Sequence, residues 1–155
     1  MSQNDNAMAT LRVNKLDLSG SVADGPGVRL VVFLQGCDKK VKCAFCHNPS
    51  SHLLGGGTSM TVGDIVSELM KSPIRKVTLS GGEPLAQEEG LRCLLDVLKE
   101  NGFDIALYTW RQKDQVPEGI LNQIDWLKVG EYRHELRTST TPFVGSLNQK
   151  FLCVA

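Results

Sequence analysis

The sequence predicts an α/β fold, a partial and open βα barrel with a mostly parallel sheet. Short, β-branched apolar runs alternate along the chain with segments whose apolar residues recur at helical spacing, which is typical of a parallel sheet with helical crossovers. The chain has 155 residues, whereas a closed eight-stranded barrel takes about 250. We therefore expect an incomplete barrel, formed by residues 10–155 as one domain after a disordered N-terminal segment, residues 1–9.

Four segments are expected to form the core strands. Residues 28–34 (VRLVVFL) are a mostly apolar run between two turn-like sequences, which is typical of a strand buried on both faces of a parallel sheet. Residues 74–79, 105–109 and 125–129 have the same character. These strands define the order in which the loops between them must be considered.

The connecting segments carry helix signals. Thr61 is a typical N-cap, Asp64 follows three residues later, and Pro73 ends the helix that they begin. A second helix is expected from about residue 87 to 100, where leucines recur on one side before an Asn-Gly pair. Residues 116–123 are expected to form a short third helix.

Charge and hydropathy argue against two classes of partner. The chain carries 17 basic and 17 acidic side chains, with no basic tract and no stripe of interleaved aromatics, which argues against direct binding of nucleic acid. No apolar run approaches the roughly 18 residues that cross a bilayer, and the N-terminus has no apolar signal segment. With five cysteines, an odd number that fits a reducing compartment, the sequence predicts a soluble cytoplasmic protein.

Three cysteines, Cys37, Cys43 and Cys46, fall within ten residues. A structural zinc or a simple electron-transfer cluster normally has four protein ligands, so three thiolates leave one position open for another molecule. That arrangement favours chemistry over scaffolding. The alternatives are a zinc site completed by His47 or a distant residue, and unrelated thiols.

A glycine-rich loop, residues 80–84 (SGGEP), follows the second predicted strand, as the cysteines follow the first. The carboxyl ends of parallel strands meet at one edge of the sheet, where α/β folds place functional residues. Gly81 and Gly82 allow a backbone to approach a ligand closely, and Glu83 is able to accept a hydrogen bond from an ammonium group. An ordinary strand-to-helix turn opened by Pro84 is the alternative.

These motifs together resemble the radical S-adenosylmethionine superfamily. The resemblance rests on residues 43–49 (CAFCHNP), 24–29 (DGPGVR) and 80–84 (SGGEP), and more narrowly it is to the activases of glycyl radical enzymes. Residues 128–132 (KVGEY) and 145–151 (GSLNQKF) are similar to the end of anaerobic ribonucleoside-triphosphate reductase activating proteins. The resemblance extends from about residue 11 to residue 151.

The resemblance implies two cofactors, one [4Fe–4S] cluster and S-adenosylmethionine, which fills the open iron position. It implies reductive cleavage of S-adenosylmethionine to a 5′-deoxyadenosyl radical and formation of a glycyl radical on anaerobic ribonucleotide reductase, with an electron donor such as flavodoxin. An activase of another glycyl radical enzyme, of the pyruvate formate-lyase type, is the alternative within this class, and a zinc-binding interaction module is the alternative outside it. The implied metal ligands are Cys37, Cys43 and Cys46, and the implied cofactor-binding residues are Phe45, Ser80, Gly81, Gly82, Glu83 and Tyr108.

The chain departs from the superfamily pattern at the first cysteine spacing. Five residues separate Cys37 from Cys43, where the superfamily usually has three. Loop-closure free energy grows only with the logarithm of loop length, so the longer loop costs well under ~1 kcal/mol. Three lysines in this loop are expected to raise the cluster potential or to bind an acidic partner.

Three further features have expectations attached. The resemblance suggests that the turn at residues 24–27 (DGPG) borders the entrance for the partner's glycine, although a turn before a strand needs no function. Arg29 either faces that entrance or caps an edge. Cys93 and Cys153 lie in apolar segments and are predicted to be buried structural thiols.

Overall fold

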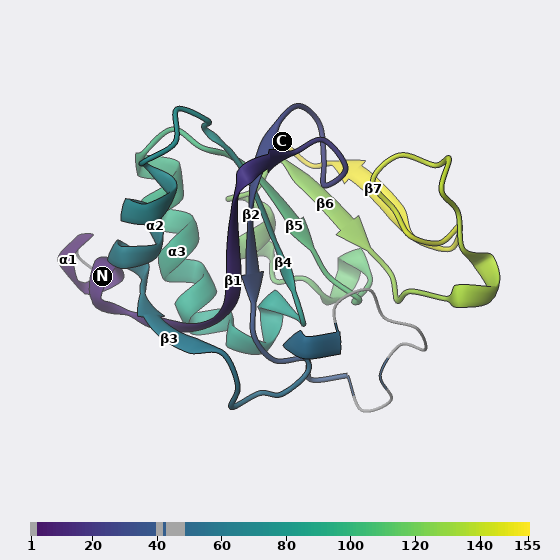
Figure 1. Ribbon diagram of the computed structural model, residues 1–155, viewed down its shortest axis with the longest axis horizontal. Coiled ribbons are helices and arrows are strands. Elements are labelled where there is room, and N and C mark those ends of the chain that lie inside the picture. The colour runs from purple at the N-terminus through teal and green to yellow at the C-terminus, as the bar shows by residue number, and fades with distance from the viewer. Residues whose placement is uncertain (1–2, 40–41, 43–48) are drawn as a thin grey trace.

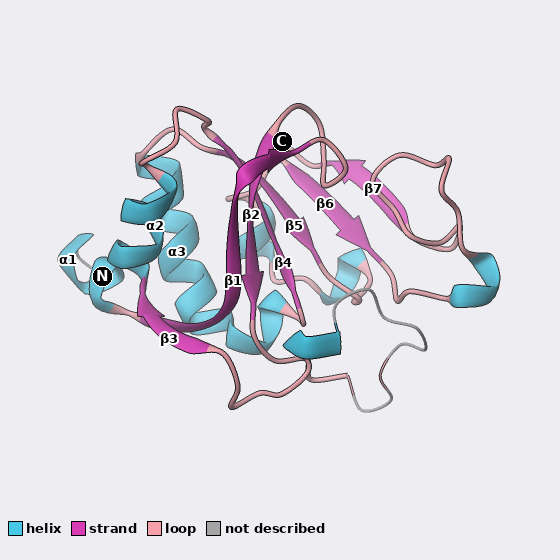
Figure 2. Ribbon diagram, viewed as in Figure 1, coloured by secondary structure: helices cyan, strands magenta, loops and turns pink. Residues whose placement is uncertain are grey.

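The computed structural model describes residues 3–39, 42 and 49–155. Its centre is one seven-stranded sheet with the order β3-β1-β2-β4-β5-β6-β7 (Figures 1 and 2). The strands are β1 (Thr10–Ser21), β2 (Arg29–Leu34), β3 (Thr58–Thr61), β4 (Lys76–Gly81), β5 (Asp104–Tyr108), β6 (Trp126–Val129) and β7 (Lys150–Cys153). Strands β2, β4, β5 and β6 are parallel, and the outer pairings are antiparallel. The predicted open, mostly parallel α/β sheet is confirmed.

The helices of the described chain are α1 (Gln3–Met8), α2 (Val62–Leu69), α3 (Glu88–Glu100) and α4 (Glu118–Leu121), with short 3₁₀ turns at Pro49–Ser51, Pro84–Gln87, Lys113–Gln115 and His134–Leu136. The predicted N-cap of α2 is present, because the backbone N–H of Asp64 donates to the Thr61 hydroxyl at 3.1 Å. None of these helices is long and apolar enough to span a membrane in the part of the chain that is described.

The hydrophobic core lies between the helices and one face of the sheet. Residues at alternate positions of the strands belong to it, such as Leu30 on β2, Val77 on β4 and Ile105 on β5, which are register partners. The leucines of α3 pack against them. Because side chains alternate along a strand, the residues between these positions lie on the opposite face, which we call the open face.

Near the ends of the parallel strands the open face is polar and aromatic. Phe33 is the register partner of Ser80, Tyr108 is the partner of Lys128, and Lys128 is in turn the partner of Phe151. Phe33, Tyr108 and Phe151 are aromatic, and Ser80 and Lys128 are polar. The sheet thus presents a partly exposed aromatic surface on the side away from the helices.

Two expectations for the ends of the chain are corrected. Residues 1–9 were expected to be disordered, but Gln3–Met8 form α1, and the buried Asn6 side chain donates to Asp96 of α3 at 3.3 Å. Packing against α3 stabilises a helix that has no periodic pattern of its own. Cys153 is exposed, because its side chain points away from the core at the end of β7, whereas Cys93 is buried as predicted.

Candidate functional site

A cavity opens where the parallel strands end. It brings together Cys37 after β2, the glycine loop after β4 and the end of β5, as the positions of the motifs predicted. The residues that line it are Cys37, His52, Ser80, Gly81, Gly82, Tyr108, Thr109, Trp110, Lys128, Gly130, Tyr132 and Gln149. Four of the predicted cofactor-binding residues, Ser80, Gly81, Gly82 and Tyr108, are therefore at the cavity.

The two glycines are required by the contact between β4 and β2. Gly81 has a φ of 120°, and a Cβ there would lie 2.2 Å from the backbone oxygen of Leu34. A Cβ on Gly82 would lie 2.2 Å from the backbone oxygen of Gly36. Only glycine tolerates both the backbone conformation and this approach. The sequence predicted close approach to a ligand, and the structure shows that the cysteine loop's own backbone is the nearest neighbour.

Glu83 is buried and does not line the cavity. Its carboxylate accepts hydrogen bonds from the Leu85 N–H at 2.9 Å, the Thr109 hydroxyl at 2.6 Å and the Trp110 N–H at 2.9 Å. Burial raises the pKa of Glu83, and the hydrogen bonds from Thr109, Leu85 and Trp110 act against that rise. The side chain thus ties the loop after β4 to the loop after β5, where the sequence had suggested a contact with a ligand ammonium.

Of the three closely spaced cysteines, Cys37 is the one that lies among the described residues. Its thiol lines the cavity, and its backbone N–H donates to the His52 oxygen at 3.1 Å. Burial raises the pKa of this thiol, so the free thiol is protonated at neutral pH and a bound metal would have to displace its proton. The predicted residues Cys43, Phe45 and Cys46, and His47 of the zinc alternative, lie outside the described residues.

Tyr108 presents a polar group that has no partner. Its hydroxyl is buried and makes no hydrogen bond within the described chain, and burial raises its pKa. Lys128 lies over the ring, with Nζ 5.0 Å from the centroid, and Phe151 packs edge-on at 6.1 Å. A buried hydroxyl without a partner is costly. Besides burial, the charged groups that influence its pKa are Asp24 and Arg29, which lie before and at the start of β2 rather than at the cysteine loop.

Several cavity residues were not predicted from the sequence. Lys128 and Tyr132 belong to residues 128–132 and Gln149 to residues 145–151, which carry part of the resemblance, but no cofactor-binding role was expected of them. His52 lies in no motif. Gln149 has a structural role: it accepts from Gly145 N at 2.8 Å and donates to the Gly130 oxygen at 2.9 Å.

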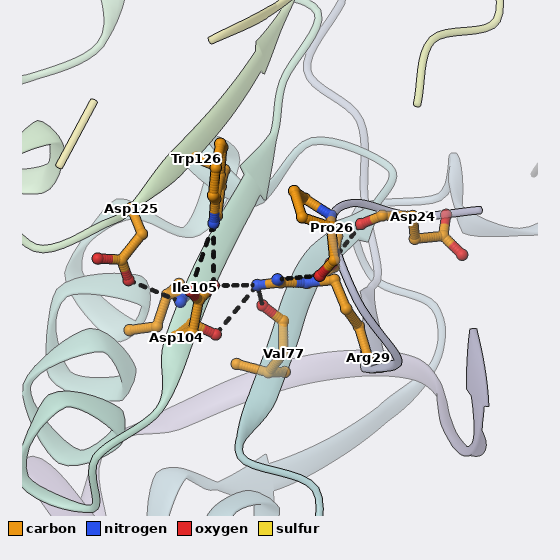
Figure 3. A network of polar contacts seen from close by, with 9 residues as sticks. Asp24, Pro26, Arg29, Val77, Asp104, Ile105, Asp125 and Trp126 are labelled. Carbon is orange, nitrogen blue, oxygen red and sulfur yellow. Dashed lines mark hydrogen bonds and ion pairs between the residues drawn. The ribbon is translucent and has the colours of Figure 1, made fainter. Parts of the chain in front are cut away.

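The DGPG turn lies at the opposite edge of the sheet, where the parallel strands begin (Figure 1). Arg29, which follows it, is fully buried. Its guanidinium donates to the backbone oxygens of Pro26, Val77 and Asp104, and it forms an ion pair with the Asp104 carboxylate at 2.7 Å (Figure 3). Arg29 therefore holds the turn against the first residues of β4 and β5.

The backbone oxygen of Asp24 accepts a hydrogen bond from the Thr78 hydroxyl at 2.6 Å, so the turn covers the part of the open face near the beginnings of the parallel strands. Val31 and Ala106 are buried there although they lie outside the main hydrophobic core. The part near the ends of these strands leads to the cavity at Tyr108. Arg29 was expected either to face the partner's entrance or to cap an edge, and in the structure it is buried and fastens the turn.

Comparison with known proteins decides between the metal sites that three cysteines allow. The chain matches the family described as a 4Fe-4S single cluster domain over residues 23–152. The chain belongs to this family. The match covers both the cysteine loop and the glycine loop, and it favours an iron–sulfur cluster over a zinc site.

Curated proteins similar to this chain include activating enzymes of pyruvate formate-lyase. Pyruvate formate-lyase-activating enzyme of Clostridium pasteurianum is 38% identical over 104 residues, which cover 63% of this chain and 42% of that relative. The same enzyme of Listeria monocytogenes is 42% identical over 86 residues (52% and 34%), and pyruvate formate-lyase 1-activating enzyme of Escherichia coli K12 is 33% identical over 123 residues (74% and 49%). The chain spans less than half the length of these relatives.

Among solved structures, QueE from Escherichia coli has a TM-score of 0.55 and 18% sequence identity, covering 80% of this chain and 72% of that one. This likeness confirms the fold. The predicted cofactors, a [4Fe–4S] cluster and S-adenosylmethionine, agree with the family and its relatives. The described residues fit them, because Cys37, the backbone of Gly81 and Gly82 and the Tyr108 side chain line the same cavity.

Proposed function

We propose that this protein is an activating enzyme that generates a glycyl radical on a protein substrate. The observation that carries the proposal is the meeting of Cys37, the Gly81-Gly82 loop and Tyr108 at one cavity of a single-cluster domain. The reduced cluster would supply one electron to cleave S-adenosylmethionine into methionine and a 5′-deoxyadenosyl radical, which takes a hydrogen atom from the partner's glycine and leaves as 5′-deoxyadenosine. An electron donor such as a flavodoxin belongs to this proposal.

We assign the ligands and contacts as follows. Cys37, Cys43 and Cys46 hold three irons, and the fourth iron is left for S-adenosylmethionine. Ser80, Gly81 and Gly82 form the cavity wall beside the cysteine loop. The Tyr108 side chain lines the cavity, and Phe45 is the expected aromatic neighbour of the bound cofactor. The carboxylate of Glu83 supports this wall from behind.

The open face supports a polypeptide as the substrate. It runs from the cavity to the DGPG turn and carries partly exposed Phe33, Trp126 and Phe151. Trp126 and Phe151 are stacked, with ring centroids 5.8 Å apart. An extended segment with a central glycine would lie on this aromatic surface with its glycine toward the cavity, since glycine brings a backbone closest to a wall.

The partner is proposed to be of the pyruvate formate-lyase type. The relatives above activate that enzyme, while the reductase was suggested by the C-terminal segments 128–132 and 145–151. Gln149 and Asn148 of those segments have internal partners: Gln149 bonds Gly130 and Gly145, and the Asn148 amide donates to the Glu131 oxygen at 2.8 Å. These contacts give Gln149 and the Asn148 amide nitrogen structural roles, while Asn148 Oδ1 is buried without a hydrogen-bond partner in the described chain. The reductase is the second candidate because the curated relatives above activate pyruvate formate-lyase.

The test is anaerobic incubation of the protein with S-adenosylmethionine, a reductant and each candidate partner, followed by paramagnetic resonance. We expect a glycyl radical on a formate-lyase-type enzyme and none on a variant whose radical glycine is replaced by alanine. A radical on the reductase alone would overturn the choice of partner. A protein that binds one zinc, shows no brown iron–sulfur absorbance and yields no radical would overturn the function.

A further inference from the structure

The loop between Cys37 and Cys43 begins with two charged residues that reach the far side of the cavity. The Asp38 carboxylate forms an ion pair with Arg111 and accepts a hydrogen bond from the Trp110 indole at 3.2 Å. Lys39 Nζ lies 2.9 Å from a carboxylate oxygen of Glu131. The loop that leaves β2 is thereby tied to the loops that follow β5 and β6.

The partners on the far side are themselves fixed. The Trp110 N–H is bound by Glu83, the Arg111 N–H donates to the Thr109 hydroxyl at 3.0 Å, and the Arg111 oxygen accepts from Gly130 N at 3.0 Å. Asp38 therefore binds to a frame that already connects the loops after β4, β5 and β6. A contact with a preformed frame orders a loop at a smaller entropic cost than a contact between two mobile segments.

The charged groups are partly shielded from water. The side chains of Lys39 and Arg111 are 15% and 21% exposed, against 68% for Lys71 in the surface pair with Glu68. Shielded, hydrogen-bonded pairs are stronger than exposed ones. The hydrogen bond from Lys39 is also the largest influence that holds the pKa of Glu131 below its usual value.

We propose that Asp38 and Lys39 are positioning residues that hold Cys37 at the cavity wall, because they join the chain next to Cys37 to the loops after β5 and β6. This inference deepens the proposed function, since it assumes that the cluster binds at Cys37. It also reassigns Lys39, which the sequence suggested for an external acidic partner. Lys42 has internal contacts too, because its Nζ donates to the backbone oxygens of Cys37 and Lys39.

The first test uses the apoprotein and needs no cluster. The loop contains Lys39, Lys40 and Lys42, so trypsin reports how often it detaches, since cleavage of a native protein tracks the population of the open form. Asp38→Asn and Glu131→Gln keep every lysine and should raise cleavage within the loop about three- to tenfold. Asp114→Asn, at an exposed position of the loop after β5, is the matched control and should leave it unchanged.

The second test measures the cluster itself. After anaerobic reconstitution, we expect Asp38→Asn to lose iron to a chelator several-fold faster than the wild type and the Asp114→Asn control. The double variant Asp38→Asn/Arg111→Gln should be no faster than Asp38→Asn alone, because both changes remove the same ion pair. Unchanged cleavage and unchanged iron loss in Asp38→Asn would overturn the proposal, as would faster cleavage with unchanged iron loss.

The two proposals fail in distinguishable ways. If the wild type takes up no iron while the Asp38 variants still detach the loop, the proposed function fails and the role in positioning a cluster fails with it. If the wild type takes up a full cluster and the Asp38 variant keeps it equally well, only the positioning role is overturned.

Discussion

Replacing Glu83 by glutamine tests the finding that this carboxylate holds two loops together. One carboxylate oxygen accepts from the Leu85 N–H and the other from Thr109 and Trp110. Glutamine has one oxygen, so if it keeps Thr109 and Trp110, its amide group faces the Leu85 N–H and two donors meet. A glutamine of the same shape therefore removes one hydrogen bond and leaves a buried donor unpaired.

The expected cost follows from those contacts. An unpaired buried donor costs about 1–3 kcal/mol, and two bonds to a charged acceptor become bonds to a neutral one at about 1 kcal/mol each. Because burial raises the pKa of Glu83, removing the charge returns part of this loss, and we expect a net destabilisation of about 3 kcal/mol. For a chain of this size, that lowers the melting temperature by about 6–12 °C.

The assay is thermal unfolding of the apoprotein, which separates a structural role from a role in binding the cofactor. Glu135→Gln, at an exposed position, is the control and should change the melting temperature by no more than about 1 °C. If Glu83→Gln melts with the wild type and instead loses only its affinity for S-adenosylmethionine, the carboxylate is a direct ligand and the reasoning above is refuted.

Three other changes test other parts of the molecule. Gly82→Ala puts a Cβ 2.2 Å from the backbone oxygen of Gly36, next to Cys37, and should abolish cluster uptake. The control Gly55→Ala, whose Cβ would have no atom within 4 Å, should keep the full iron content. Equal iron content in the two variants would contradict the assigned packing. Arg29→Met leaves the buried oxygens shown in Figure 3 unpaired and should cost about 3–5 kcal/mol in urea unfolding, and a loss below about 1 kcal/mol would refute the network. The Glu131 pKa is lowered from 4.5 mainly by Lys39, so this pair stabilises the fold above that pH and the gain is lost as pH falls through the lower folded value. An NMR titration should show the Glu131 pKa rising in Lys39→Met, and an unchanged pKa would argue against the pair.

The parallel strands could be predicted because each is a short run rich in apolar residues, several of them β-branched, and separated from the next by helix or turn signals. The expected strands at 28–34, 74–79, 105–109 and 125–129 correspond to β2, β4, β5 and β6. The antiparallel strands β1, β3 and β7 were missed. β1 is largely polar along its second half, and β3 and β7 are four residues each, so pairing with a distant neighbour decides their conformation rather than a local pattern.

The site could be predicted only as far as its motifs reach. The cysteine and glycine loops were expected at one edge, and the structure places Cys37, Gly81 and Gly82 at one cavity there. The partners of Asp38 lie 72 and 73 residues further along the chain. No pattern within the loop identifies them, so these contacts could be found only from the folded structure.

The most direct test of the account is the composition and resonance spectrum of the anaerobically reconstituted protein before and after addition of S-adenosylmethionine. Three thiolates with one open iron predict about four irons per chain and a spectrum of the reduced cluster that changes when S-adenosylmethionine is added. The Cys37→Ala variant should lose both properties. One zinc per chain, or a full cluster whose spectrum does not respond to S-adenosylmethionine, would contradict the central claim.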